Sequence, residues 1–388
     1  MPRPLFSLVL LHCALVLSVA PAWASDAAAD NEELQEALQR TYEPLDLRLF
    51  GDSIGHWKMK DGREHQYDRY QPEQIVHIAE NLLRYQNEDG GWAKNIDCLA
   101  NVDPHVIREL RGGTLGKSTF DNRTTYSQIE YLAKVFKVTG LERYRKGAER
   151  GLFFTLDTQN ESGGWKGSDV DAVTYNDDVM TGVMRLLLRI RENAPEYDWV
   201  STEMRSRLSD ALDRAIQVTL NCQIEVDGQL TAWCQQHDHK TLKPIKARAY
   251  ELPSICSSES ASVVRFLMEL PAPDDRVIAA VDAAVAWLDE VKIENVRIEE
   301  VKIKPVVFKH HTAKFDRVAV EDPNAPPIWA RFYEIKTSKP FFCRRDGTKV
   351  DSLAEVDLER RSGYGWYTHK PEHLLSVEYP KWKARISK

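Results

Sequence analysis

The sequence lacks the features that mark nucleic-acid-binding proteins and several common enzyme classes. Its 388 residues carry a net charge of −7, and no block of six or more basic residues occurs. Nucleic acids and anionic membrane surfaces bind clustered positive charge, so we expect neither as a partner. No P-loop, H-E-x-x-H zinc motif or dinucleotide-binding glycine pattern is present. A polyanionic substrate stays compatible with this composition if arginines are concentrated in one cleft.

Cysteine is scarce, with six residues in the whole chain and no C-x-x-C arrangement. The cysteines are too widely spread for a zinc ribbon. In an oxidising compartment one or two disulfides can form, and Cys222 and Cys234 are the candidate pair. The alternative is that the cysteines are buried thiols.

Long apolar runs are missing beyond the N-terminus, where no stretch approaches the roughly 18 apolar residues of a membrane-spanning helix. Residues 1–24 have the features of a signal peptide: Arg3, an apolar run over 6–19 and a small-x-small site at 22–24. We therefore predict a secreted or periplasmic protein. Residues 25–45, rich in alanine and acidic residues, are expected to form a mobile lead-in to a single domain over 46–388.

Helical periodicity dominates what is present. Apolar residues fall on one helical face at Ile75, Ile78 and Leu82, and the same spacing recurs within 129–136, 179–187, 208–220 and 263–267. Alternating strand patterns are few, and residues 296–308 could be strand or irregular structure. From about residue 300 the chain is rich in loops, and we expect this extension to pack back on the helical part.

A repeat links these helices. Residues 86–92 (Gln-Asn-Glu-Asp-Gly-Gly-Trp) recur at 159–165, and a looser copy spans 223–233, at a spacing of about 70 residues. That spacing holds two helices and their loops, and repeated helix pairs bury their apolar faces by stacking on their neighbours. Closing the pairs into a ring gives an α/α toroid with the tryptophan loops at one rim. Trp92 and Trp165 either stack on a sugar ring there or fill gaps between helix pairs.

Two acidic segments precede predicted helices one repeat apart. Residues 118–125 contain Asp121, and residues 174–178 contain Asp177. Hard oxygen ligands on loops suit calcium, and equivalent helix starts in a toroid lie at the same rim. The alternatives are a helix cap at Asp121 and a favourable interaction of Asp177 with the helix dipole.

Three arginines are candidates for binding carboxylates. Arg248 lies in a loop before a predicted helix, and Arg331 and Arg345 lie in the C-terminal extension. A guanidinium can hold a carboxylate through two parallel hydrogen bonds. The alternative for any one of them is a surface ion pair.

Blocks of the sequence resemble the family 10 pectate lyases. They include Gly-Gly-Trp-Ala-Lys-Asn at 90–95, Thr-Phe-Asp-Asn-Arg-Thr-Thr at 119–125, Tyr-Asn-Asp-Asp-Val-Met at 175–180, Arg-Ala-Tyr-Glu at 248–251, Trp-Ala-Arg-Phe-Tyr at 329–333, Arg-Asp-Gly at 345–347 and Glu-Arg-Arg-Ser-Gly-Tyr at 359–364. They occur in the family's order over roughly residues 70–370. The resemblance implies an all-α fold, an (α/α)3 toroid that cleaves polygalacturonate by β-elimination with Ca2+.

The resemblance also implies roles for individual residues. Asp121 and Asp177 correspond to calcium ligands, and Asn122 corresponds to a substrate contact. Arg248 stands where the family has its Brønsted base, and Arg331 and Arg345 stand where it has arginines that bind substrate carboxylates. A free guanidinium has a pKa above about 12 and is therefore a poor base at neutral pH. We expect nearby calcium and the other arginines to disfavour the protonated form of Arg248.

The sequence departs from the family pattern at two places, and two other functions are compatible with it. Ala93 replaces a common proline, and the loop over 95–117 is long and charged. A toroidal glycoside hydrolase would use paired carboxylates and water without calcium. A non-catalytic pectin-binding protein would show no turnover. We expect a monomer whose substrate is polygalacturonate.

Overall fold

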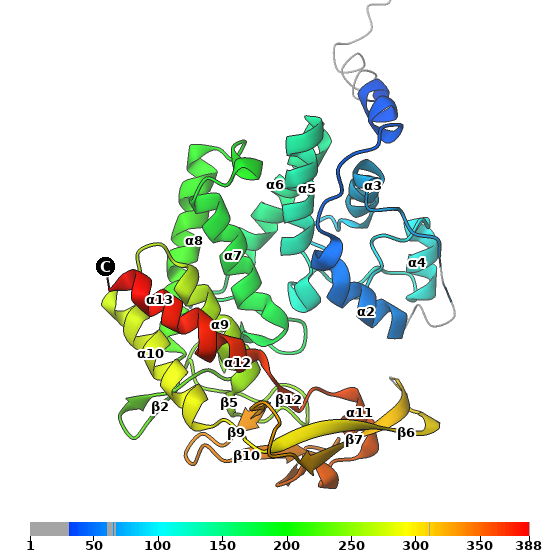
Figure 1. The fold of residues 1–388 in the computed structure, drawn as a ribbon. Helices are drawn as coiled ribbons and strands as arrows, with labels where there is room; N and C mark the ends of the chain where they lie inside the picture. The colour runs from blue at the N-terminus through cyan, green and yellow to red at the C-terminus, as the bar shows by residue number, and fades with distance from the viewer. Residues whose placement is uncertain (1–30, 60–64, 66, 310, 388) are drawn as a thin grey trace, which may run out of the picture. The chain divides into compact units, whose positions relative to one another are not determined.

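The computed structural model describes residues 31–59, 65, 67–309 and 311–387 (Figure 1). The predicted signal peptide lies outside these residues. Residues 31–38, in the expected lead-in, are helical, and residues 41–388 form a separate compact unit. In the ranges described, no helix is both long enough and apolar enough to cross a membrane.

Helices arranged in pairs make up the larger part of the unit. Helix α5 packs on α6, α7 packs on α8, and α9 packs on α10. Neighbouring helices are also in contact within the layer α5, α7 and α9 and within the layer α6, α8 and α10. Helix α3 contacts α5 and α6. Figure 1 shows α7 to α10 in this layered arrangement. The helices are α2 (Gly51–Met59), α3 (Ile75–Tyr85), α4 (Pro104–Leu110), α5 (Tyr126–Thr139), α6 (Glu142–Asp157), α7 (Val179–Arg191), α8 (Thr202–Asn221), α9 (Ser257–Glu269), α10 (Asp275–Glu290), α11 (Leu358–Gly363), α12 (Lys370–His373) and α13 (Tyr379–Ile386).

Local sequence signals fix where several helices begin and end. Ser201 and Asp274 accept hydrogen bonds from the backbone N–H groups of Met204 and Val277, and so cap α8 and α10. Helix α5 ends at Gly140, whose φ of 74° is the left-handed conformation that glycine adopts without a Cβ clash. The apolar face that each helix then buries holds the paired layers together.

Small sheets accompany the helices, so the expected all-α class is too simple. A four-stranded sheet has the order β11–β10–β9–β5, and two-stranded sheets pair β1 with β4, β12 with β8, β2 with β3 and β6 with β7. The strands are β1 (Ala172–Thr174), β2 (Glu225–Val226), β3 (Gln229–Leu230), β4 (Gln236–Asp238), β5 (Ile255–Cys256), β6 (Val296–Val307), β7 (Thr312–Glu321), β8 (Trp329–Ala330), β9 (Phe332–Tyr333), β10 (Pro340–Cys343), β11 (Lys349–Val350) and β12 (Tyr367–Thr368). Since β9 pairs with β5, just before α9, the extension packs on the helical part as expected.

The repeated tryptophans are buried, with Trp92 2% exposed and Trp165 and Trp233 0% exposed. Each indole N–H donates to a carbonyl of the preceding helix: Trp92 to Leu82 at 2.8 Å, Trp165 to Thr155 at 2.8 Å and Trp233 to Thr219 at 2.7 Å. Their faces are therefore closed to a sugar, and the predicted substrate stacking of Trp92 and Trp165 is wrong. They fill the space between helix pairs, which was the alternative.

The repeated glutamine explains how each loop is attached to the next pair. In every copy its amide donates to one carbonyl in its own turn and one in α6, α8 or α10 (Gln86 to Gly90 and Gly147, Gln159 to Gly163 and Ala211, Gln223 to Thr231 and Ala280). A buried backbone carbonyl left without a partner is costly, so one side chain satisfies two such groups at each junction.

The cysteines are thiols. All five in the described part of the chain are buried and unpaired, including Cys222 and Cys234. The suggested disulfide between these two is therefore not formed, and the alternative of buried thiols holds.

Candidate active site

Two short 3-10 turns lead into neighbouring helices and carry the acidic residues. Turn η2 (Asp121–Arg123) precedes α5, and turn η3 (Asn176–Asp178) precedes α7. In both, consecutive non-glycine residues adopt positive φ: 53° and 58° at Asn122 and Arg123, and 52° and 57° at Asp177 and Asp178. Such residues cost about 1–3 kcal/mol each and cluster at functional sites. The two turns contact each other, so the predicted convergence of Asp121 and Asp177 is observed.

Asp121 is buried and its carboxylate is neutralised on one side. Its Oδ2 atom accepts from Lys94 Nζ at 2.7 Å and from the Ser168 backbone N–H at 2.9 Å, and it also accepts from the Ser168 hydroxyl. The other oxygen, Oδ1, lies against Gly167, where any Cβ would collide with it. Glycine at 167 therefore allows the carboxylate to sit between the two turns.

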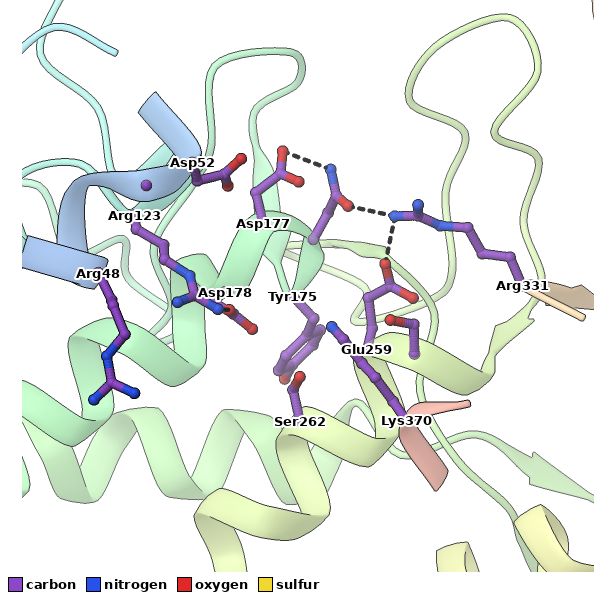
Figure 2. Close-up of a pocket in the computed structure, with 13 residues that line it drawn as sticks. Arg48, Asp52, Arg123, Tyr175, Asp177, Asp178, Glu259, Ser262, Arg331 and Lys370 are labelled. Atoms are coloured by element: carbon purple, nitrogen blue, oxygen red, sulfur yellow. Dashed lines mark hydrogen bonds and ion pairs between the residues drawn. The ribbon is translucent and has the colours of Figure 1, made fainter. Parts of the chain in front are cut away.

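Asp177 has a different environment. Its Oδ2 atom accepts from Asn176 Nδ2 at 3.0 Å, and no basic side chain in the described ranges forms an ion pair with it (Figure 2). Loss of water contact and the nearby Asp121 raise the pKa of Asp177 to about 7, although Arg331 and Arg248 act in the opposite direction. The negative charge of Asp121 and Asp177 is therefore only partly balanced by the neighbouring cations.

The donor set at the two turns fits a calcium ion. Carboxylate oxygens are hard ligands, and a bound cation would relieve the repulsion that raises the pKa of Asp177. No group of three or more His, Cys, Asp or Glu side chains is close enough to hold a metal anywhere in the described residues. Calcium takes about 6–8 oxygens, so the remaining ligands would be water or the carboxylates of a bound molecule.

Arg331 lies beside Asp177 in a cavity of about 430 Å3. Its Nη2 donates to Asn176 Oδ1 at 2.8 Å and to Glu259 Oε1 at 2.7 Å, and Figure 2 shows both bonds. Burial lowers the pKa of Arg331, but Glu259, Tyr364, Asp177 and Glu251 together outweigh burial and raise it. Arg331 is thus a fixed positive charge next to the acidic turns.

Arg248 is held by a buried carboxylate. Its Nε donates to Glu251 Oε2 at 2.8 Å, and the Glu251 side chain is 1% exposed. Burial would lower the pKa of Arg248, but the Glu251 ion pair outweighs it and raises the pKa. The Glu251 carboxylate therefore acts against the destabilisation of protonated Arg248 that we expect from calcium and the other arginines.

The ring of Tyr364 joins the two arginines. The guanidinium carbons lie 5.8 Å (Arg248) and 4.7 Å (Arg331) from its centroid, within cation–π range. The Tyr364 hydroxyl donates to Glu251 Oε1 at 2.8 Å. Arg248 and Arg331 are therefore placed on one aromatic residue, close enough to Asp177 to influence its pKa.

Arg345 and Asn122 occupy the margins of this group. The Arg345 guanidinium lies 5.6 Å from the ring centroid of Tyr250, and Arg248 lies 5.4 Å from the same centroid. Asn122 is buried and its amide donates to Asn95 Oδ1 at 2.5 Å. The structure thus brings Arg345 to Arg248, whereas Asn122 has its amide turned to a protein partner.

The position of Lys94, the partner of Asp121, could have been recognised from the repeat. Lys94 follows Trp92 by two residues, as Arg331 follows Trp329 by two. Trp329 is a fourth copy of the buried tryptophan, since its indole N–H donates to Leu288 O at 2.7 Å. Position two after this tryptophan therefore supplies a cation to the acidic turns in both copies. Glu251 and Tyr364 stand in the blocks at 248–251 and 359–364, but the sequence assigned neither of them, nor Glu259, a role in the site.

Comparisons with known proteins give consistent results. The family model described as pectic acid lyase matches residues 86–375. Among solved structures, a family 10 polysaccharide lyase from Cellvibrio cellulosa is 27% identical with a TM-score of 0.67, covering 88% of this chain and 99% of that one. A mutant of that lyase in complex with trigalacturonic acid has the same identity and TM-score, covering 87% and 99% of the two chains. The comparison with curated proteins gives no match.

Proposed function

The chain belongs to the pectic acid lyase family and is a pectate lyase, and we propose that it cleaves polygalacturonate by calcium-dependent β-elimination with Arg248 as the base. One observation carries the proposal: Asp177, whose turn contacts the turn of Asp121, lies within electrostatic reach of Arg248 and Arg331. The similar lyase bound to trigalacturonic acid supports a polygalacturonate substrate.

We further propose that the paired helices form an (α/α)3 toroid and that residues 46–388 are the single catalytic domain. The layered contacts of α5 to α10 support the first point. Residues 1–24 as a signal peptide would deliver a monomeric enzyme to the periplasm or the medium.

Substrate binding would use the carboxylate-binding arginines. Arg331 and Arg345 present planar guanidinium groups suited to a uronate carboxylate, and Tyr364 and Tyr250 hold them from one side. Asp121 and Asp177 would hold a calcium ion, which when bound neutralises the uronate carboxylate and stabilises negative charge developing beside C5. The role of Asn122 would be to bind substrate after giving up its bond to Asn95.

The elimination itself is one proton transfer coupled to bond cleavage. A neutral Arg248 takes the C5 proton, a double bond forms between C4 and C5, and the C4–O bond breaks. The departing oxygen takes a proton from water, so the product carries a 4,5-unsaturated uronate. Arg248 must first lose its own proton to solvent, and the ion pair with Glu251, which holds Arg248 protonated, opposes that loss. Because this ion pair raises the pKa of Arg248, we expect activity to increase toward alkaline pH.

The experiment is to incubate the protein with polygalacturonate, with and without a calcium chelator, and to follow the ultraviolet absorbance of unsaturated uronate. We expect absorbance to rise only when calcium is available. Arg248→Ala should lose turnover, while the control Arg344→Ala, which removes an exposed arginine outside the site, should keep it. Turnover that survives chelation without ultraviolet-absorbing product would indicate a hydrolase, and binding without any turnover would indicate a pectin-binding protein. A flat pH–rate profile up to about pH 10 would count against Arg248 as the base.

A further inference from the structure

A second cleft opens beside the active site, between α2 and the strand β7. Its volume is about 790 Å3, larger than that of the cavity at the acidic turns. Helix α2 supplies Lys58, β7 supplies Lys314 and Arg317, and the segment around α11 supplies Arg360 and Tyr364. The reaction described above does not use this cleft.

Four lysine and arginine side chains line the cleft, and among the described residues Arg317 and Arg360 form ion pairs with Glu300 and Glu359, whereas the two lysines form none. The described residues that line it include no aspartate or glutamate, although acidic residues outnumber basic ones in the whole chain, 59 to 52. Lys58 and Lys314 are exposed, and neither forms an ion pair within the part of the chain that the structure describes. Two solvated ammonium groups without carboxylate partners, on opposite walls, favour an anionic ligand.

The cleft also offers an apolar surface. The ring of Phe315 lines it and is partly exposed, with the Arg317 guanidinium 5.1 Å from the ring centroid. Sugar rings bind well where an aromatic surface lies beside charged hydrogen-bond donors, because binding sites combine apolar contact with a few placed polar groups. A uronate has both of these properties.

The cleft is continuous with the catalytic residues at three points. Tyr364 lines the cleft, and its ring is contacted by Arg248 and Arg331. Arg360 lines both this cleft and the hollow that contains Arg248 and Arg345. Helix α2 has Asp52 in the cavity beside Asp177 at its first turn and Lys58 in the cleft at its last turn. A chain bound at the acidic turns can therefore extend along α2 into the cleft.

We propose that this cleft is a distal subsite that binds additional galacturonate units of a long polygalacturonate chain through Lys58 and Lys314. The proposal rests on the proposed function for its choice of ligand. It predicts a dependence on substrate length, since a short oligomer held at the acidic turns does not reach the lysines. The lysines contribute binding in the ground state and the transition state alike, so they lower KM without changing kcat.

The test compares the wild type with the double variant Lys58→Gln/Lys314→Gln on two substrates, trigalacturonate and polygalacturonate. We expect KM for polygalacturonate to rise ~5-fold or more with kcat unchanged, as the loss of two exposed charge contacts implies. KM for trigalacturonate should stay the same. The matched control is Lys146→Gln/Lys336→Gln, which removes two exposed lysines that do not line the cleft and should leave both values unchanged.

Two outcomes would overturn the distal subsite. One is a double variant whose KM for polygalacturonate equals that of the control variant. The other is an equal loss on both substrates, which would place the lysines at the catalytic centre or in the fold. Calorimetric Kd values for the same two substrates are measured in parallel. If the wild type shows no elimination, the proposed function fails, and the length dependence of the Kd values still decides for or against the cleft.

Discussion

The turns η2 and η3 each hold two consecutive residues at positive φ, yet their carboxylates have different partners. Asp121 is bound by Lys94 and by Ser168, whereas Asp177 accepts only from Asn176 within the described residues. The pKa of Asp177 is accordingly raised to about 7 by loss of water contact and by Asp121. One repeat thus supplies a charge-compensated carboxylate, and the next supplies a carboxylate that titrates near neutral pH.

Neighbouring repeats can thus place two carboxylates with different charge compensation at one site. Asp121 is the first residue of η2 and Asp177 is the second residue of η3, so the two carboxylates leave their turns from different positions, and the residues around each turn decide its charge. Lys94 comes from the loop after Trp92, and its counterpart after Trp165 is Gly167, which only makes room. The predictions below test whether these two carboxylates act together or separately.

The largest effect is expected from removing either carboxylate charge. Asp121→Asn and Asp177→Asn should each lower the rate of elimination by about 10²–10³-fold, because each removes a preorganised electrostatic group at the reacting centre. Initial rates on trigalacturonate at saturating calcium give the measurement. The control is Asp171→Asn, an exposed carboxylate near the site that should retain activity. If only one of the two variants is impaired, the carboxylates do not share a metal.

The second effect is the pH dependence of calcium binding. Below pH 7 Asp177 is protonated, and this proton must leave before a cation binds. The affinity for calcium should therefore fall about tenfold for each pH unit below 7 and be constant above pH 7. Calorimetric titration of the wild type with calcium between about pH 5 and about pH 8 provides the profile. Asp177→Asn should bind calcium weakly and without this slope. A slope that persists in the variant assigns the proton to another group.

A smaller effect is expected from making the first turn resemble the second. Lys94→Met removes the cation bound to Asp121, and calcium affinity at about pH 8 should rise ~5-fold because a nearby positive charge no longer opposes the ion. Lys166→Met is the matched control, since Lys166 pairs with the exposed Asp171 instead. Weaker calcium binding by Lys94→Met would mean that the lysine positions Asp121 and does not compete with the metal.

The smallest effect concerns the common scaffold beneath both turns. Trp92→Phe and Trp165→Phe each leave a helix carbonyl without its indole donor, so the free energy of unfolding should fall by about 1–2 kcal/mol in each variant. Chemical denaturation measures this loss. KM for trigalacturonate should not change, because both rings are buried. A KM several-fold higher at unchanged stability would restore the sugar-stacking role.

The repeat made the helix pairs predictable because its glutamine and tryptophan have structural tasks that require those side chains. Gln86 and Trp92 both bond to backbone carbonyls, and the same bonds recur one repeat later. The pattern could not distinguish a tryptophan that fills a gap from one that faces a sugar, because both uses place an aromatic ring in a loop. Only burial separates them.

The fourth tryptophan and the ion pair of Arg331 could not be predicted from the sequence, the first because of an insertion and the second because its partners are distant in sequence. The hairpin β6–β7 lies between α10 and Trp329, so the fourth tryptophan falls outside the regular spacing. The partners of Arg331, Asn176 and Glu259, are 155 and 72 residues away in sequence. Such pairs follow from the fold and not from local pattern, which is why the position of Arg331 was predictable and its ion pair was not.

The hairpin β6–β7 has a consequence for how the protein behaves at high concentration. It is a sheet of two strands only, with Val301, Val306 and Val307 exposed along β6. A bare strand edge of this length invites a strand from another molecule to add to it and begin aggregation. Pro305 provides no N–H to such a strand, the register shifts between Lys302 and Val306, and Lys302 and Lys304 add like-charge repulsion. The edge is thus guarded against self-association, while the part of β7 that pairs with this stretch of β6 lines the cleft.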